Sequence, residues 1–287
     1  MKKIIFLVLA AGLFLVGCSS DSDDGSFNSA RQINVVSRED GSGTRGAFVE
    51  ILGIEVAGAD GSVRDMTTVD AEIAPGTNAV ITNISGDTYA IGYISLGSLN
   101  DTVTAINVGG IAPTAGNVQS GVYPLFRTFY IAVQDNLDDL SQDFVNFIMS
   151  AEGQAVVSRN YVPAATNASA YSVNDLSGTI VVSGSTSVAP LMERLKEAYE
   201  AINSDVTIEV HASGSTAGIN AAISGLADIG MSSRELRENE LADVNAIAIA
   251  FDGLAVIVNN ENPTSNLTPE QIRQIFVGDI TNWNGLN

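Results

Sequence analysis

Three short runs of serine, threonine and glycine have the composition of an oxyanion-binding site. They are Ser42-Gly43-Thr44, Ser183-Gly184-Ser185-Thr186-Ser187 and Ser213-Gly214-Ser215-Thr216. At a helix N-terminus, unpaired backbone N–H groups and the positive end of the helix dipole favour a negative ligand, and hydroxyls add further donors. Serine and threonine also cap helices for structural reasons, so one such run is a weak indication. Three runs in one chain favour an anion site.

Each run lies between a β-branched stretch and a stretch with helical spacing, so each is expected to join the end of a strand to the start of a helix. The two patterns alternate along the chain, which predicts an α/β fold with helices covering the sheets. The expected strands are 33–36, 90–95, 103–106, 129–133, 179–182, 206–210, 247–251 and 254–258. The expected helices are 48–52, 77–84, 141–159, 188–202, 217–224 and 268–276, the last one begun by Thr268 and Pro269.

Other chemistries fit these residues less well. The sequence has no Gly-Lys-Ser/Thr, so a nucleotide-hydrolysing P-loop is not expected. It has one Cys and one His, too few for a metal cluster of these ligands, and we predict no metal and no cofactor. A hydrolase is the alternative class, because residues 214–218 come near a nucleophile elbow and His211 lies four residues before Ser215. The central residue of this elbow is Thr216 rather than serine, so we predict no catalytic residues and no enzyme.

The charge balance excludes nucleic acid as a partner. The chain has 13 basic and 33 acidic residues and a net charge of −20, whereas nucleic-acid binding needs a basic surface. A small anion is not excluded, because N–H dipoles act at short range and the net charge is screened within about 8 Å at physiological salt. With 45% hydrophobic residues, the chain is expected to form a sizeable core, as one large domain or two lobes.

The N-terminus has the pattern of an export signal. Lys2 and Lys3 precede an apolar run at 4–16, which is short for a membrane span, and Gly17-Cys18 follows. This pattern resembles the lipobox of bacterial lipoproteins, so we expect a signal peptide at 1–17 and lipidation of Cys18. Residues 18–31 would then be a tether, and the mature protein would be lipid-anchored to the bacterial cell membrane on its extracytoplasmic side. An ordinary signal peptide with an incidental cysteine is the alternative.

Four motifs, at 37–45, 184–190, 213–219 and 227–234, resemble the ligand loops of one transport-receptor family. This is the phosphate-binding protein of the bacterial ABC phosphate importer, the PstS type, and the resemblance covers nearly all of 31–287. It implies a two-lobed, type II periplasmic-binding-protein fold with the ligand cleft between the lobes. It also implies a monomeric receptor that binds inorganic phosphate and delivers it to an ABC permease in the membrane. A receptor for another oxyanion, or a non-transport sensor or adhesin lipoprotein, is the alternative.

The motifs occur in a rotated order. In the family, the segments that correspond to 179–287 precede those that correspond to 33–163, whereas here they follow. We therefore expect a circular permutation in which 164–178 joins the ancestral termini, with a truncated tandem duplication as the alternative. The expected lobes are a split one, 32–114 plus 262–287, and a continuous one, 115–258. Their crossings are expected near Pro113 and Pro263.

The resemblance assigns contacts with phosphate to eight residues, namely Arg38, Ser42, Gly43, Thr44, Ser185, Thr186, Ser215 and Ser233. Arg38 would supply positive charge and paired donors to a tetrahedral anion, and Asp40 is expected to orient it. Ser233 stands where some members have an aspartate that accepts a proton from phosphate and helps to reject sulfate, so selectivity among oxyanions stays open. Arg234 is expected either to contact the ligand or to pair with Glu238, four residues on.

Overall fold

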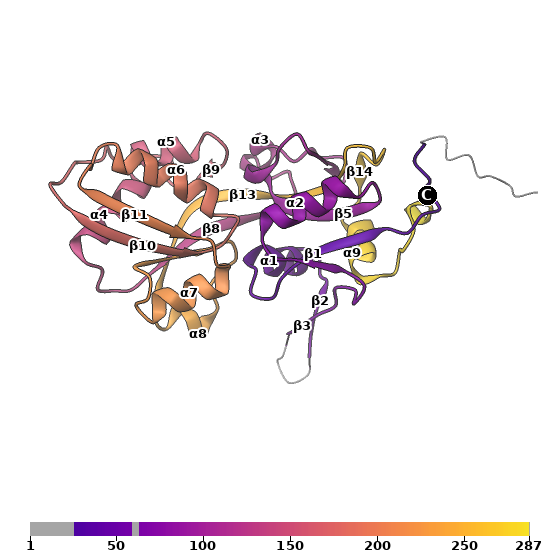
Figure 1. Cartoon of the computed structure of the whole chain (residues 1–287), viewed down its shortest axis with the longest axis horizontal. Helices are drawn as coiled ribbons and strands as arrows, with labels where there is room; N and C mark the ends of the chain where they lie inside the picture. Colours follow the sequence, from indigo (N-terminus) through magenta and orange to yellow (C-terminus); the bar gives the residue numbers. More distant parts are fainter. Residues whose placement is uncertain (1–25, 59–62, 287) are drawn as a thin grey trace, which may run out of the picture.

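Two lobes are joined by a pair of long strands (Figure 1). The computed structural model describes residues 26–58 and 63–286, so the expected signal peptide and the lipidation site at Cys18 lie outside the described residues. The connecting strands are β8 (Phe126–Val133) and β13 (Asn245–Asn259), which pair antiparallel with each other. The two-lobed α/β fold expected from the sequence is confirmed.

The first lobe holds the two ends of the described chain. Its strands are β1 (Asn34–Arg38), β2 (Glu55–Ala57), β3 (Val63–Asp65), β4 (Glu72–Ala74), β5 (Ala90–Ser95), β6 (Val103–Ala105), β7 (Asn107–Val108) and β14 (Asn266–Leu267). Its helices are α1 (Gly43–Ile51), α2 (Thr77–Gly86), α3 (Ala115–Gln119) and α9 (Pro269–Val277), with short 3₁₀ turns η1 (Leu96–Ser98) and η2 (Trp283–Leu286). The ribbon of β2 and β3 projects from this lobe (Figure 1).

The second lobe is built from the middle of the chain. Its strands are β9 (Val162–Pro163), β10 (Gly178–Gly184), β11 (Val206–His211) and β12 (Ile229–Ser232). Its helices are α4 (Asp139–Met149), α5 (Ala151–Val157), α6 (Ala189–Glu200), α7 (Ser215–Ile223) and α8 (Glu238–Leu241). Over residues 26–58 and 63–286, no helix has the length and apolar character needed to cross a membrane.

One path of hydrogen-bonded strands runs through both lobes, in the order β11-β10-β12-β8-β13-β5-β1-β4. Strand β13 provides this continuity: Asn245 to Gly253 pair with β8, and Leu254 to Val258 pair with β5. The sequence predicts two strands here, because Asp252 and Gly253 interrupt the apolar run. The structure has one strand, since partners on both sides of the interruption keep the backbone extended.

The hydrophobic cores place the lobe boundary inside these two strands. One core includes Leu125, just before β8, and Leu254 from the second half of β13. The other core includes Phe129 from β8 and Ala250 from the first half of β13. The chain therefore passes from one lobe to the other near residues 126 and 253.

The crossings expected near Pro113 and Pro263 are thus wrong. Val118 of α3 and Val256 of β13 both pack in the core of the first lobe, so 115–125 and 254–258 belong to that lobe and not to the second. Proline fixes the backbone only locally. The boundary lies instead where the side chains of the crossing strands change from one core to the other.

The end of the expected tether packs against the first lobe. The ring of Phe27 lies 5.1 Å from the ring of Tyr89 and 5.8 Å from that of Trp283, between centroids. The backbone N–H of Asn284 donates to the carbonyl oxygen of Ser29 at 2.7 Å. Residues 27–31 are therefore part of the fold, and the expectation that the tether extends over 18–31 is wrong for its last five residues.

Ser150 divides the helix expected over 141–159 into α4 and α5. Its backbone is extended, with ψ at 170°, and its hydroxyl accepts from the N–H of Gly153 at 3.2 Å. The same hydroxyl donates to the carbonyl oxygen of Phe147 at 2.7 Å. One serine thus ends α4 and caps α5, which a helical period alone does not reveal.

Most of the segment expected to join the ancestral termini, 164–177, is irregular but held in place; Gly178 already begins β10. The buried carboxylate of Asp143 in α4 accepts from the hydroxyl of Tyr171 and the side-chain amide of Asn174, both at 2.5 Å. It also accepts from the hydroxyl of Tyr199 in α6 at 2.7 Å. Asp143 therefore connects this segment to two helices of the second lobe.

Candidate functional site

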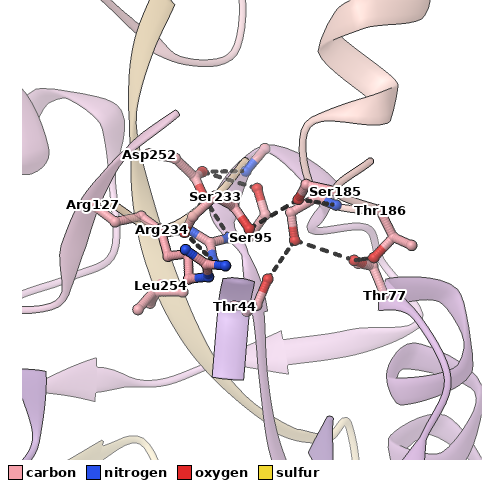
Figure 2. Close-up of polar contacts among 12 residues, drawn as sticks. Thr44, Thr77, Ser95, Arg127, Ser185, Thr186, Ser233, Arg234, Asp252 and Leu254 are labelled. Atoms are coloured by element: carbon pink, nitrogen blue, oxygen red, sulfur yellow. Dashed lines mark hydrogen bonds and ion pairs between the residues drawn. The ribbon is translucent and has the colours of Figure 1, made fainter. Parts of the chain in front are cut away.

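The serine and threonine runs meet between the two lobes (Figure 2). Thr44, in the first turn of α1, lies 2.7 Å from Ser187, hydroxyl to hydroxyl, across the lobe boundary. Ser185 in the same run donates to the hydroxyl of Ser233 at 2.9 Å, and Ser215 at the start of α7 lies 3.4 Å from that hydroxyl. The structure therefore brings together the three runs that the sequence singles out, at the N-termini of α1, α6 and α7.

A fourth helix N-terminus, missed in the sequence, completes this group. Thr77 begins α2, is 4% exposed, and lies 3.3 Å from the hydroxyl of Thr186 and 3.4 Å from that of Ser187. Gly76 before it has φ of 97°, a conformation that favours glycine. The signal in the sequence was Pro75-Gly76-Thr77 ahead of the predicted helix over 77–84, the same polar entry to a helix as in the other runs.

Arg38 supplies the positive charge of the site. Its side chain is 1% exposed, and its Nε and Nη2 each donate at 2.7 Å to a carboxylate oxygen of Glu39. Nη2 also donates to the hydroxyl of Thr186 at 3.0 Å, across the lobe boundary. Nη1 is buried and has no hydrogen-bond partner among the described residues. A buried guanidinium donor without a partner is costly, so this atom marks where an acceptor fits.

Glu39 takes the orienting role that the sequence assigned to Asp40. Partial burial alone would raise the pKa of Glu39, but the hydrogen bonds and charge of Arg38 outweigh it and hold this pKa below its ordinary value. Asp40 is exposed and pairs instead with Arg45, at 2.9 Å. The expectation for Asp40 is wrong, because β1 ends at Arg38 and the carboxylate of Asp40, beyond that end, faces Arg45, whereas that of Glu39 faces Arg38.

Ser233 is the node of the hydroxyl network in the second lobe. It is fully buried, its backbone N–H donates to the hydroxyl of Ser215 at 3.2 Å, and its own hydroxyl receives the bond from Ser185. A hydroxyl both donates and accepts, so Ser233 can face an oxyanion that is protonated or fully ionised. An aspartate in this position would only accept while it is ionised.

Gly43 is a point of close approach between the lobes. A Cβ atom at this position would lie 2.3 Å from the hydroxyl oxygen of Ser215 and 2.7 Å from that of Ser233. No side chain fits there without displacing these residues. Ser42, the residue before it, caps α1 by accepting from the N–H of Arg45 at 3.3 Å. Its hydroxyl oxygen is therefore used within its own helix.

Arg234 pairs with Glu240 rather than with Glu238. Nη1 and Nη2 of Arg234 donate to the two carboxylate oxygens of Glu240 at 2.8 and 2.7 Å, and Nη2 also donates to the hydroxyl of Thr216 at 3.2 Å. This carboxylate compensates the charge of Arg234. His211 is exposed, and its Nε2 lies 3.6 Å from a carboxylate oxygen of Glu209.

These contacts define the chemistry that the site offers. Several buried hydroxyls, the first turns of helices and one guanidinium with a donor to spare lie at the boundary between the lobes. Donors in such density suit a small ligand with several acceptor oxygens. The eight residues assigned from the resemblance lie on these elements, although their contacts with a ligand stay a prediction.

Fold and site together place the chain in a class of two-lobed binding proteins, and the profile of the PBP superfamily domain matches residues 20–152 and 169–286. Phosphate-binding protein PstS 2 of Streptococcus agalactiae serotype V is 43% identical over 99% of this chain and 98% of its own length. The crystal structure of the phosphate-binding protein of a phosphate ABC transporter from Streptococcus pneumoniae TIGR4 is 44% identical, with a TM-score of 0.72, and the match covers 90% of this chain and 100% of that chain. The chain belongs to the PstS family, which confirms the resemblance that the motifs indicated.

Other relatives match over less of their length. Phosphate-binding protein PstS of Bacillus subtilis is 32% identical over 113 residues, which is 38% of each chain. Similarity to this family member is therefore found along a limited part of the sequence.

Proposed function

We propose that this protein is an extracytoplasmic receptor that binds inorganic phosphate between its lobes and delivers it to an ABC permease in the membrane. The observation that carries the proposal is Nη1 of Arg38, a buried donor without a partner among the described residues, on a guanidinium whose Nη2 donates to Thr186 of the opposite lobe. Relatives of full-length similarity are named phosphate-binding proteins, which supports the choice of anion.

The geometry explains how closure and binding would be linked. Arg38, Gly43, Thr44 and Thr77 belong to the first lobe, and the run at 185–187 with Ser233 belongs to the second. An anion between them accepts hydrogen bonds from donors on both sides. Closing the lobes removes the anion from water, and each of these hydrogen bonds becomes stronger in the protein interior. The chain crosses near 126 and 253, so these two points are the proposed hinge.

Binding rather than catalysis is the activity that we infer. The hydroxyl of Ser215 contacts Ser233, and the pair partner of His211 is Glu209, so the histidine does not activate the serine of the elbow-like run. The names of the full-length relatives describe binding proteins as well. A His211→Ala variant is expected to keep full phosphate affinity.

Calorimetric titration with phosphate tests the proposal directly. The double variant Arg38→Ala, Thr44→Ala is expected to lose measurable high-affinity binding, because it removes the guanidinium and one bridging hydroxyl. Arg273→Ala is the matched control: it removes an arginine paired with Glu270 on α9 and should bind like the wild type. Equal affinity of the double variant and the wild type would refute the assignment.

The second candidate function is a receptor for another oxyanion. The observation that favours it is the hydroxyl of Ser233 at the site. A hydroxyl in this position presents no fixed negative charge to a fully ionised anion such as sulfate. Competition of sulfate and arsenate against bound phosphate distinguishes the two cases. Displacement by sulfate at concentrations close to those of phosphate would assign a general oxyanion receptor.

We further propose that the receptor is a monomer, lipid-anchored through Cys18, and that its chain is circularly permuted within the family. A match that covers only 38% of both chains supports the permutation. When the order of two segments is exchanged between two sequences, one alignment can match only one of the segments. The irregular segment 164–177 supports it too, as a connection added between old ends. Mass spectrometry of the membrane-bound protein tests the anchor: a Cys18→Ser variant is expected to be released without lipid.

A further inference from the structure

A second polar cluster lies on the two crossing strands, next to the hydroxyl network. Arg127 of β8 and Asp252 of β13 are directly opposite each other in the strand pairing. Their side chains are 3% and 1% exposed, and Nε and Nη2 of Arg127 donate to one carboxylate oxygen of Asp252 at 3.3 and 3.2 Å. The pair thus lies at the point where the chain crosses between the lobes.

The pair also contacts both lobes. Nη1 of Arg127 donates to the backbone carbonyl oxygen of Ser233 at 3.3 Å, in the second lobe. The other carboxylate oxygen of Asp252 accepts from the hydroxyl of Ser95 at 2.9 Å and from the N–H of Gly97 at 3.4 Å, in the first lobe. Figure 2 shows this chain of contacts running from Ser95 through Asp252 and Arg127 to the Ser233 loop.

We propose that Arg127 and Asp252 are positioning residues of the anion site, which hold the Ser233 loop in place and set the positive charge behind it. The inference rests on the proposed phosphate binding and names two residues that the sequence motifs did not include. Arg127 fixes the carbonyl of Ser233, so that the hydroxyl and N–H of the same residue face Ser185 and Ser215.

Stability alone does not account for such a pair. Removing two charges from water is expensive, and an apolar pair of similar volume is often at least as stable. A residue that holds a site, in contrast, needs donors in a fixed geometry, and the planar guanidinium provides them in two directions at once. Arg127 uses one side for Asp252 and the other for Ser233.

The pair also affects the electrostatics of the anion site. Complete burial raises the pKa of Asp252 to about 6, although Arg127 and Ser95 oppose this shift. The other titratable groups that face Asp252 are Tyr123 and Tyr161, whose pKa values burial raises, so both stay neutral. Arg127 in turn feels the charge of Arg38. Ionised Asp252 cancels the charge of Arg127, and protonated Asp252 leaves that charge to attract the anion.

The test measures phosphate affinity of the whole protein by calorimetry between pH 5 and pH 8. Arg127→Lys keeps the charge but not the fork, and we expect binding about tenfold weaker, as for the loss of one charged hydrogen bond. For Asp252→Asn we expect a change in the pH profile. The ratio of the wild-type affinity to the affinity of this variant should rise severalfold as the pH falls through 6, because only the wild type gains a proton at this position. Phosphate itself also titrates in this range, but it does so equally for both proteins, so its effect cancels in the ratio.

Asp143→Asn is the matched control. It changes another buried, hydrogen-bonded aspartate, in the second lobe and away from the site, and should lower stability without changing affinity or its pH profile. If the wild type binds phosphate, and Arg127→Lys and Asp252→Asn match it at every pH, the positioning role is refuted and the proposed function stands. A wild type that binds no phosphate overturns both.

Discussion

Gly43→Ala should weaken phosphate binding by opposing closure of the lobes. The added Cβ would lie 2.3 Å from the hydroxyl oxygen of Ser215 and 2.7 Å from that of Ser233, both in the opposite lobe. The separation needed for ordinary contact is 3.4 Å or more, so one partner must move by about an ångström. The backbone of Gly43 is not in the left-handed region, so alanine itself fits the helix.

The size of the effect follows from overpacking. Extra atoms in a packed interior typically cost about 1–3 kcal/mol. The cost applies to the closed arrangement, in which Gly43 contacts the second lobe, and much less to an arrangement with the lobes apart. Because binding of the anion depends on closure in this proposal, affinity should fall by about 5- to 150-fold.

Calorimetric titration with phosphate measures this loss, and thermal unfolding without phosphate shows that the fold is intact. Gly46→Ala is the matched control, since it lies one turn along α1 and its Cβ would meet only the Cδ of Arg234, at 3.4 Å. Its affinity should stay within a factor of two or so of the wild type. Equal affinities for Gly43→Ala and the wild type would show that these contacts do not accompany binding.

Three further outcomes are expected. Thr77→Val should weaken phosphate binding several-fold in calorimetry, because it removes a buried hydroxyl with almost no change of volume; unchanged affinity would remove α2 from the site. Asp143→Asn should lower the free energy of unfolding in urea by about 1–3 kcal/mol, since three donors now share the two carboxyl oxygens of Asp143 and the asparagine would leave them one acceptor oxygen; a smaller change would mean that the segment at 164–177 is held by other contacts. Burial raises the pKa of Asp252 from 3.8 to about 6, so between these pH values the folded state binds a proton that the unfolded state does not. The stability that this proton contributes is fully present below about pH 4 and is lost as the pH rises through 6. Relative to Asp252→Asn, the unfolding free energy of the wild type should therefore fall by up to about 3 kcal/mol between pH 4 and pH 7 in urea titrations; a flat difference would contradict the raised pKa.

Local sequence patterns predict much of the fold. The strand expected at 90–95 is β5, residue for residue, and α9 begins after Thr268 with Pro269 in its first turn. Both features depend on neighbouring residues: an apolar run for the strand, and a capping hydroxyl with a following proline for the helix. The helix expected over 188–202 is α6, but it ends at Glu200, and Ile202 beyond its end is 44% exposed.

Some residues of the candidate site are predictable from the sequence, and others are not. The hydroxyl runs are visible in the sequence, because they recur between strand and helix patterns. Thr77 was missed, since a lone threonine after glycine resembles any helix start. The partners of Arg38 and Arg234 were misassigned for a different reason: several acidic residues are near each arginine in the chain, and only the fold decides which carboxylate faces it.

The sequence by itself determined the α/β alternation, the hydroxyl runs and their motifs, because these depend on residue type and short spacing. Only the tertiary structure decided where the chain crosses between the lobes, that β13 is one strand, and that Arg127 and Asp252 connect that strand pair to Ser233. These features arise from pairing between segments more than a hundred residues apart. Cross-strand register and burial, which fix such pairings, are properties of the packed molecule and not of any local stretch.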